Sequence, residues 1–352
     1  MNANKRTNYQ EEIIWGIFDL TCSMSMDPPS AKKRRGEDSN GGASSPPKSS
    51  HTNVQWLIWT LTDSALPTGG FAHSSGLESA VHQGLVTDSA SLESFGQRVI
   101  SQAAWNLVPL VTAGLEASAV GSEDEEEEEE EGEGEEEGGS GSVSSRVEAW
   151  ARLDRLCHAT MSNHVARRAS EATGNALLRV AAATFPEAEE TTLKPLRKRL
   201  RGDPTLRGHH APLFGFIVGL VSRNGGAGGS GGGIDGATAG RMLLFSILRD
   251  LVSAAVRLNL VGPFEASALQ RRLCAAAEQT VRERARSSSS SSFSGPDGPS
   301  KVELEAASSS SSSPSAATAE ASAARVEVWQ TDPILDLIQG SHDQLYSRLF
   351  VS

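Results

Sequence analysis

Four low-complexity stretches interrupt this chain, and they constrain its fold more than any other feature. Such stretches bury too little apolar surface to offset the entropy that is lost when they become ordered. We therefore expect a mostly disordered N-terminal extension, residues 1–53, and low-complexity insertions near residues 119–143, 223–239 and 286–324. The roughly 220 residues that remain are enough for one hydrophobic core. The sequence thus predicts a single domain over residues 54–352, with solvated insertions.

One insertion accounts for the acidity of the whole chain. The formal net charge is −12, but 13 acidic residues lie between Glu123 and Glu137. The rest of the chain is close to neutral, so a broad basic surface for nucleic acid is not expected. No apolar run approaches the ~18 residues that indicate a membrane span. The three cysteines are sparse and lack C-x-x-C spacing, which favours a reducing compartment and a cytoplasmic protein.

The segments between the insertions have helical rather than strand periodicity. Apolar residues recur at three- and four-residue steps over residues 92–111, and Asp88 is placed to cap this helix. Pro212 suits the first position of a later helix. In that helix Gly215 and Gly219 lie on one face, where they would let another helix approach closely. We therefore predict an all-α fold, a single helical bundle.

The most unusual ordered stretch reads SALPTGGFAHSSGLE. Pro67 and Gly69 predict a tight turn, after which Phe71 is an isolated apolar anchor. Ser75 and Glu78 have the spacing of a capping box at the start of a short helix.

Catalytic and metal-binding interpretations of the histidines are weaker. His73 and Ser74 are sequence neighbours, which rarely align a base with a nucleophile, and no G-x-S-x-G elbow is present. His209 and His210 could bind a metal, but no carboxylate or cysteine at ligand spacing supports them. A capping or hydrogen-bonding role is favoured for this pair, with a metal or partner contact left as the alternative.

Two further features concern packing and partners. A nearly apolar helix carries a narrow polar stripe that includes Arg249, Asp250 and Arg257. Such charges must be paired inside the protein or serve an interface. The last residues, from Leu345 to Val351, are unusually apolar for a chain end. They must dock on the protein's own body or on a partner, and we favour a partner.

Five sequence blocks, in the expected order, resemble the urease accessory protein F (UreF) family, in a eukaryotic form with low-complexity insertions. The blocks are S-x-A-L-P-x-G-x-F-x-x-S-x-G-L-E from Ser64 to Glu78, R-A-S-x-x-x-G-x-x-L-L from Arg168 through Gly174 to Leu178, H-x-x-x-F-G from His210 to Gly215, L-R-D-L-x-S-A-A-V-R-L-x-L-V-G-P from Leu248 to Pro263, and H-x-x-L-Y-S-R-L-F from His342 to Phe350. The resemblance covers about residues 56–118, 146–222, 241–284 and 331–352.

The resemblance implies a maturation factor rather than an enzyme. Proteins similar to this one are all-α and dimerise. They join the UreD (or UreH) accessory protein and the GTPase UreG in a complex that inserts nickel into apo-urease. In that scheme the F subunit recruits the GTPase and gates its nucleotide cycle. Nickel and GTP are handled by the complex, so no stably bound cofactor and no catalytic or metal-ligating residue is expected in this chain.

The residue patterns, read together with the resemblance, lead to hypotheses about particular residues. The predicted UreD contacts are His342, Tyr346, Arg348 and Phe350, and the predicted UreG contacts are Glu78, Arg168 and His210. A structural role is predicted for Pro67, Gly69, Phe71, Ser75, Gly174, Gly215, Arg249, Asp250 and Arg257. Two alternatives stay open: a strict GTPase-activating protein that supplies an arginine finger, and a helical scaffold unrelated to urease.

Overall fold

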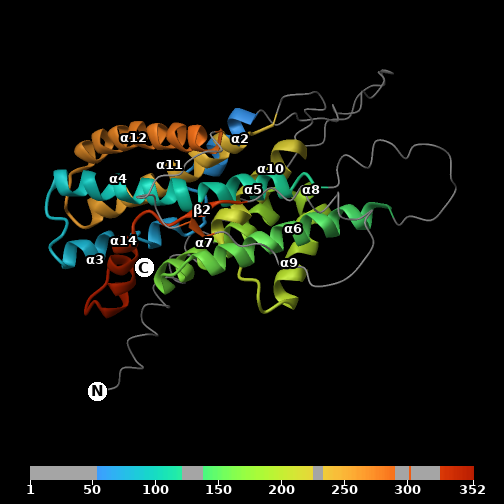
Figure 1. Cartoon of the computed structure of the whole chain (residues 1–352), viewed down its shortest axis with the longest axis horizontal. Coiled ribbons are helices and arrows are strands. Elements are labelled where there is room, and N and C mark those ends of the chain that lie inside the picture. The colour runs from blue at the N-terminus through green and yellow to red at the C-terminus, as the bar shows by residue number, and fades with distance from the viewer. Residues whose placement is uncertain (1–53, 121–137, 225–232, 290–300, 303–325) are drawn as a thin grey trace, which may run out of the picture. The chain divides into compact units, whose positions relative to one another are not determined.

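The structure, a computed structural model, describes residues 54–120, 138–224, 233–289, 301–302 and 326–352 (Figure 1). All of them belong to one of the chain's two compact units, Ser49–Ser352. The predicted N-terminal extension lies outside the described residues, as do residues 121–137, 225–232, 290–300 and 303–324 of the predicted insertions. Among the insertion residues that the structure describes, residues 138–143 begin a helix.

The described elements follow one another along the chain as α2 (Val54–Thr62), η1 (Gly70–Ala72), α3 (Leu77–His82), α4 (Ser89–Asn106), α5 (Val108–Ala117), α6 (Gly138–Thr160), α7 (His164–Thr184), α8 (Pro186–Ala188), the π-helical turn η2 (Glu189–Leu193), α9 (Lys194–Gly202), α10 (His210–Asn224), α11 (Gly236–Arg257), α12 (Pro263–Ser289), β1 (Lys301–Val302), β2 (Val328–Trp329), α14 (Pro333–Gly340) and η3 (Ser341–Gln344). The fold is all-α, as predicted. Within the described ranges the strands are limited to β1 and β2, which pair antiparallel with Lys301 opposite Trp329. None of the described helices is long and apolar enough to cross a membrane.

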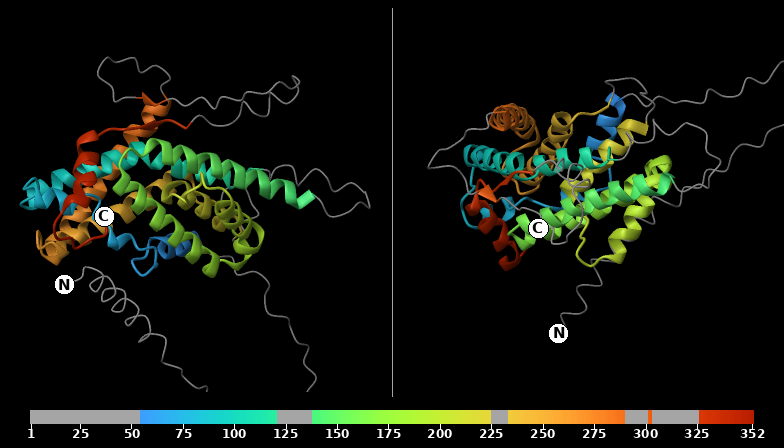
Figure 2. Two further views of the ribbon diagram at one scale, coloured as in Figure 1. Left: turned by 90° about the horizontal axis from the view of Figure 1, so that it is seen from below. Right: turned by 45° about the vertical axis from the view of Figure 1, so that its right-hand side comes forward.

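Two hydrophobic clusters form the core, and they meet at Leu107 and Ile247. The first is built mainly by α5, α6, α7 and α10 around Trp150 and Phe216. The second is built by α3, α4, α11, α12 and α14, and it includes Leu77. Figures 1 and 2 show α12 lying along α4 and α11 in this second part. Because α11 contributes side chains to both clusters, it joins them into one body.

The helix predicted over residues 92–111 is divided between α4 and α5. Asp88 caps α4 as predicted: its carboxylate accepts a hydrogen bond from Ser91 N (2.8 Å), and Ser91 Oγ accepts one from Asp88 N (3.1 Å). The chain breaks at Leu107 because Pro109 follows in the first turn of α5. Proline has no N–H to donate, and its ring crowds the carbonyl four residues earlier.

Glycines bring α5 and α10 into backbone contact, as the glycine spacing predicted. A Cβ at Gly215 would collide with the main chain of Val111, and a Cβ at Gly114 would collide with the carbonyl of Pro212. α10 begins at His210, two residues before the predicted start. This close packing fixes the position of the loop that leads into α10.

Candidate functional site at the C-terminal tail

The end of the chain folds back onto α3, and most of the predicted partner-binding residues meet there (Figures 1 and 2). We call residues 341–352 the C-terminal tail. α14 leads into the tail and packs on α3 and α7. Asp332 fixes the start of α14, because its carboxylate accepts hydrogen bonds from Leu335 N (3.0 Å) and from two nitrogens of Arg98 (2.5 and 2.8 Å). The tail therefore docks on the protein's own body, whereas the sequence favoured a partner.

Glu78 holds the tail from inside the protein. Its carboxylate accepts hydrogen bonds from Leu349 N (2.5 Å) and Phe350 N (3.2 Å), and it lies 2.8 Å from His342 Nε2. The side chains of Glu78 and His342 are 2% and 0% exposed. An unpaired buried carboxylate costs several kcal/mol, so these bonds take the place of water around the charge. We call these contacts the tail clasp.

A sharp turn before α3 aims Glu78 at the tail. Gly76, with φ of 84°, is the N-cap residue of α3, and a Cβ there would lie only 3.2 Å from Cα of Gln339 in α14. The predicted capping box is wrong, because the N-cap residue is Gly76 rather than Ser75, and glycine has no side chain to accept a hydrogen bond. Instead Ser74 Oγ accepts a long hydrogen bond from Glu78 N (3.4 Å). Glu78 is thus free to bind the tail.

The residues just before α3 bind the last two residues. Val351 N donates to the carbonyl of Ala72 (2.8 Å), and Ser74 N donates to the carbonyl of Ser352 (2.6 Å). His73 Nδ1 lies 2.5 Å from Ser352 Oγ. Burial lowers the pKa of His73, so its ring is neutral at neutral pH.

The predicted turn and the polar stripe of α11 support this region. Gly69 has φ of 78° and starts η1 just after Pro67, as the turn prediction required. Arg249 forms a half-buried ion pair with Asp250 (2.9 Å), and its guanidinium carbon lies 4.9 Å from the ring centre of Phe71. Burial raises the pKa of Asp250, and the neighbouring Arg249 opposes that shift. Two of the three stripe charges are therefore paired within the protein.

A second group of charges joins α7 to the tail at the surface. The Asp343 carboxylate accepts hydrogen bonds from two nitrogens of Arg168 (2.7 and 2.8 Å) and from Arg348 (3.3 Å), and it lies 3.0 Å from His164 Nε2. The Arg168 hydrogen bonds hold the pKa of Asp343 well below its usual range. Because these groups are partly exposed, the pairs contribute little to overall stability. They orient the outer side of the tail.

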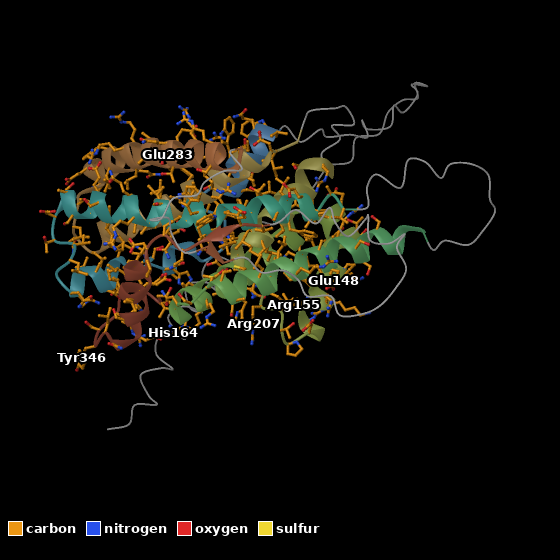
Figure 3. All side chains as sticks on the ribbon, viewed as in Figure 1. Glu148, Arg155, His164, Arg207, Glu283 and Tyr346 are labelled. Atoms are coloured by element: carbon orange, nitrogen blue, oxygen red, sulfur yellow. The ribbon has the colours of Figure 1, made fainter. Side chains whose placement is uncertain are left out.

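Apolar side chains on the outer side of α14 and the tail are left in solvent. Leu337 is 73% exposed, and Tyr346 is fully exposed and points away from the body in Figure 3. Phe350 is different: it is buried, and the guanidinium of Arg257 covers its ring at 4.3 Å. We call the exposed set the tail face, and it consists of Ile334, Leu337, Tyr346, Leu349 and Val351.

The structure divides the predicted partner-binding residues into three groups. Glu78, His342 and Phe350 are buried in the tail clasp, and Arg168, Tyr346 and Arg348 are exposed beside it. His210 lies apart from both groups and lines a cavity of about 200 Å³ between η1, α4, α7, α10, α11 and α14. Burial lowers the pKa of His210 to about 4. Partner contact by these seven residues stays a prediction.

A second buried carboxylate holds the loop between α9 and α10. Asp154 is fully buried in α6 and accepts hydrogen bonds from the backbone N–H groups of Arg207 (2.6 Å), Gly208 (3.2 Å) and His209 (2.7 Å). Gly174 in α7 has no side chain, and this lets the loop approach: a Cβ there would collide with the carbonyl of Gly208. We call these contacts the loop clasp.

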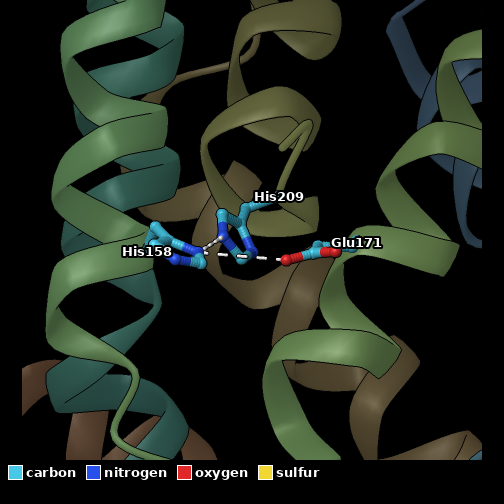
Figure 4. A group of neighbouring side chains, drawn as sticks. All are labelled: His158, Glu171 and His209. Atoms are coloured by element: carbon cyan, nitrogen blue, oxygen red, sulfur yellow. Dashed lines mark hydrogen bonds and ion pairs between the residues drawn. The ribbon is translucent and has the colours of Figure 1, made fainter. Parts of the chain in front are cut away.

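The loop clasp places His209 beside two potential metal ligands that sequence spacing did not indicate. His209 Nε2 lies 3.1 Å from His158 Nδ1, and Glu171 Oε1 lies 3.9 Å from the same His158 nitrogen (Figure 4). The three side chains come from the loop, α6 and α7, and their ligand atoms lie within 4.8 Å of one another. Because 51 positions separate the two histidines, no local ligand spacing exists for sequence reasoning to find.

Comparison with known proteins gives consistent matches. The UreF family model matches residues 86–274. Urease accessory protein F of Arabidopsis thaliana is 34% identical over 299 residues, which cover 85% of this chain and 93% of that protein. Urease accessory protein F of Oryza sativa subsp. indica is 33% identical over 295 residues, 84% of each chain. Urease accessory protein UreF of Mycobacterium marinum is 35% identical over 133 residues, 38% of this chain and 49% of that protein.

Proposed function

The chain belongs to the UreF family of urease accessory proteins, and on that premise we propose that it is a non-enzymatic adaptor in urease maturation. In this proposal it joins an accessory protein of the UreD (UreH) type and a GTPase of the UreG type, acts as a homodimer within their complex, and gates the GTPase. The complex as a whole inserts nickel into apo-urease. Nickel and GTP are therefore used by the complex as a whole and are not cofactors of this chain.

The observation that carries the adaptor proposal is the tail face. Exposed apolar side chains on a segment that is already ordered can bind a partner without a further entropy cost for fixing that segment. The tail clasp supplies this order, because Glu78 binds two backbone N–H groups of the tail as well as His342. We assign the tail face, together with Arg348, to the UreD-type partner. His342 and Phe350 then act by holding the tail rather than by touching that partner.

The contact with the UreG-type GTPase is assigned to α7. Of the three residues predicted to contact a UreG-type GTPase, Arg168 has an exposed side chain, whereas Glu78 is buried and His210 faces the cavity. Arg168 binds Asp343 of the tail. A GTPase that competes for Arg168 would therefore be coupled to the position of the tail.

The experiment is a test of complex assembly and urease activation with surface variants. The variant Leu337→Asp/Tyr346→Asp places charge on two exposed positions of the tail face, so the fold should be retained. The matched control is Phe264→Asp, since Phe264 is 95% exposed on α12 and α12 packs on α4 and α11. In cells that lack the protein, the control should restore urease activity and co-purify with the UreD-type partner.

The double variant should lose both properties. Co-purification and urease activity equal to those of the control would contradict the proposed partner surface. Normal urease activity in cells that lack this protein altogether, without added nickel, would contradict the maturation role itself.

A further inference from the structure

The cluster of His158, Glu171 and His209 has the donor set of a transition-metal site. Imidazole nitrogens combined with one carboxylate suit first-row transition ions such as Zn²⁺ and Ni²⁺, whereas Mg²⁺ and Ca²⁺ prefer oxygen ligands alone. Two nitrogens bound about 2.1 Å from such an ion lie about 3.0–3.4 Å apart, depending on the angle between them. The observed separation between His158 Nδ1 and His209 Nε2 is 3.1 Å. Glu171 Oε1 lies 3.9 Å from His158 Nδ1, so this carboxylate would have to move closer to join the same shell.

Contacts outside the cluster orient His209 toward it. The backbone of His209 is held by Asp154, and its Nδ1 lies 3.2 Å from Ser170 Oγ. Ser170 Oγ also accepts a hydrogen bond from His210 N (3.1 Å), which fixes its position. When His209 Nδ1 carries the proton and donates to Ser170, the lone pair of Nε2 points at the cluster. Such second contacts to the far nitrogen are the usual support of a metal-binding histidine.

The cluster is buried on one side and open to solvent on the other. His209 is fully buried, but the side chains of His158 and Glu171 are 33% and 32% exposed. The site is thus open to solvent on one side, through which an ion and its water ligands can enter.

Without a metal, one hydrogen bond accounts for the contact between the two rings. In that state His158 Nδ1–H donates to His209 Nε2. The alternative tautomer of His158, with the proton on Nε2, presents a lone pair from each ring to the space between them. Because His158 is partly exposed, water can accept its Nε2 proton. Both states are available to the same arrangement of backbone and side chains.

From this geometry we infer that His158, Glu171 and His209 form a binding site for one divalent first-row transition ion. The site goes beyond the adaptor role and departs from the sequence-based expectation that no residue of this chain ligates a metal. It also does not depend on the tail face, so its test uses the isolated full-length chain, and its failure would leave the adaptor proposal untouched.

The test measures Ni²⁺ binding by isothermal titration calorimetry. The double variant is His158→Ala/Glu171→Gln, which alters the two partly exposed ligands and leaves the buried His209 in place. The matched control is His82→Asn, because His82 is an exposed helical histidine outside the cluster. We expect one tight site in the wild-type chain and in the control, and affinity weakened by at least about tenfold in the double variant. Circular dichroism checks that the variants are folded.

Two results would overturn the site. One is equal Ni²⁺ affinity in the wild type and the double variant, which would place the ion elsewhere, for instance on the acidic tract. The other is an X-ray absorption spectrum of the Ni²⁺-loaded wild type with oxygen scattering alone, since the proposed site requires two imidazole ligands. This second measurement needs no variant and so does not depend on how the variants fold.

Discussion

The tail clasp and the loop clasp use the same kind of hydrogen bonding in two different parts of the molecule. In each, a buried helix carboxylate accepts hydrogen bonds from backbone N–H groups of a segment without regular structure: Glu78 binds the tail, and Asp154 binds the loop before α10. The tail, however, follows α14 and is otherwise held by hydrogen bonds and ion pairs, whereas the loop is anchored by helices at both ends. The tail can therefore leave its carboxylate and regain water, and the loop cannot do so without wider unfolding.

The two clasps also present different chemistry. The tail clasp buries its histidine and turns apolar side chains outward, which suits a protein partner. The loop clasp turns His209 toward a second histidine and a carboxylate, which suits a cation. Hydrogen bonds from backbone N–H groups to a buried carboxylate thus support two different kinds of recognition.

The largest expected effect is on the loop clasp. Asp154→Ala leaves three backbone N–H groups without an acceptor, two of them buried, and we expect it to lower the free energy of unfolding by about 3–5 kcal/mol. Urea denaturation measures this change. Asp343→Ala, which removes a partly exposed carboxylate, serves as the control and should cost no more than about 1 kcal/mol. A loss below that value for Asp154→Ala would mean that the loop is not held as described.

The next effect is a pH dependence of the free energy of unfolding, which arises from His209 in the loop. The folded pKa of His209, about 4, lies below its unfolded value of 6.5, so the unfolded chain binds more protons between these two values. Stability should therefore be complete above pH 6.5 and fall as the pH is lowered toward 4, by on the order of 3 kcal/mol. His210 should add to the same trend. His209→Gln should show a shallower pH dependence in urea titrations, and an unchanged slope would rule out His209 as its source.

A smaller global effect is expected at the tail clasp. Glu78→Ala should lower the free energy of unfolding by only about 1–2 kcal/mol, because the released tail can hydrogen-bond to water. Its signature is local: amides from His342 to Val351 should exchange much faster with deuterated water. Tyr346→Ala, at a fully exposed position, should leave that protection unchanged. If Glu78→Ala destabilises the protein as strongly as Asp154→Ala, the contrast between the two clasps fails.

The smallest effect is expected from the outer contact on Phe350. Arg257 covers that ring at 4.3 Å, a partly exposed cation–π contact worth about 0.5–1 kcal/mol. Arg257→Ala should therefore reduce the melting temperature slightly, with exposed Arg152 of α6 as the site of a control Ala substitution. An identical melting temperature for both variants would remove Arg257 from the contacts that hold the tail.

Local sequence patterns predicted the helices well and their ends less well. The period of apolar residues indicated α4 and α5, and Asp88 was correctly identified as a cap. The apolar period does not predict the break at Leu107, because that period continues across Pro109 while proline interrupts the backbone hydrogen bonds. The capping box at Ser75 failed for a tertiary reason: Glu78 is bound by the tail, 271 positions away at Leu349.

The site was predictable only where its residues lie close in sequence or in a family pattern. The resemblance pointed to Glu78 and His342, but not to their direct contact or to their burial. The cluster at His209 had no local signal, because its other members belong to α6 and α7 and meet it only through packing. The three side chains meet because Gly174 lets the loop approach α7. No short stretch of the sequence indicates this approach.

The most direct test of the account is the affinity of the purified chain for a UreD-type accessory protein, compared between wild type and Glu78→Ala. Glu78 is buried and would touch no partner, so it can affect binding only by ordering the tail face. If release of the tail costs about 1–2 kcal/mol, the affinity should fall by roughly tenfold, with hydrogen exchange confirming that the tail is released. Unchanged affinity in a chain whose tail is demonstrably loose would contradict the central claim that the tail clasp presents the partner surface.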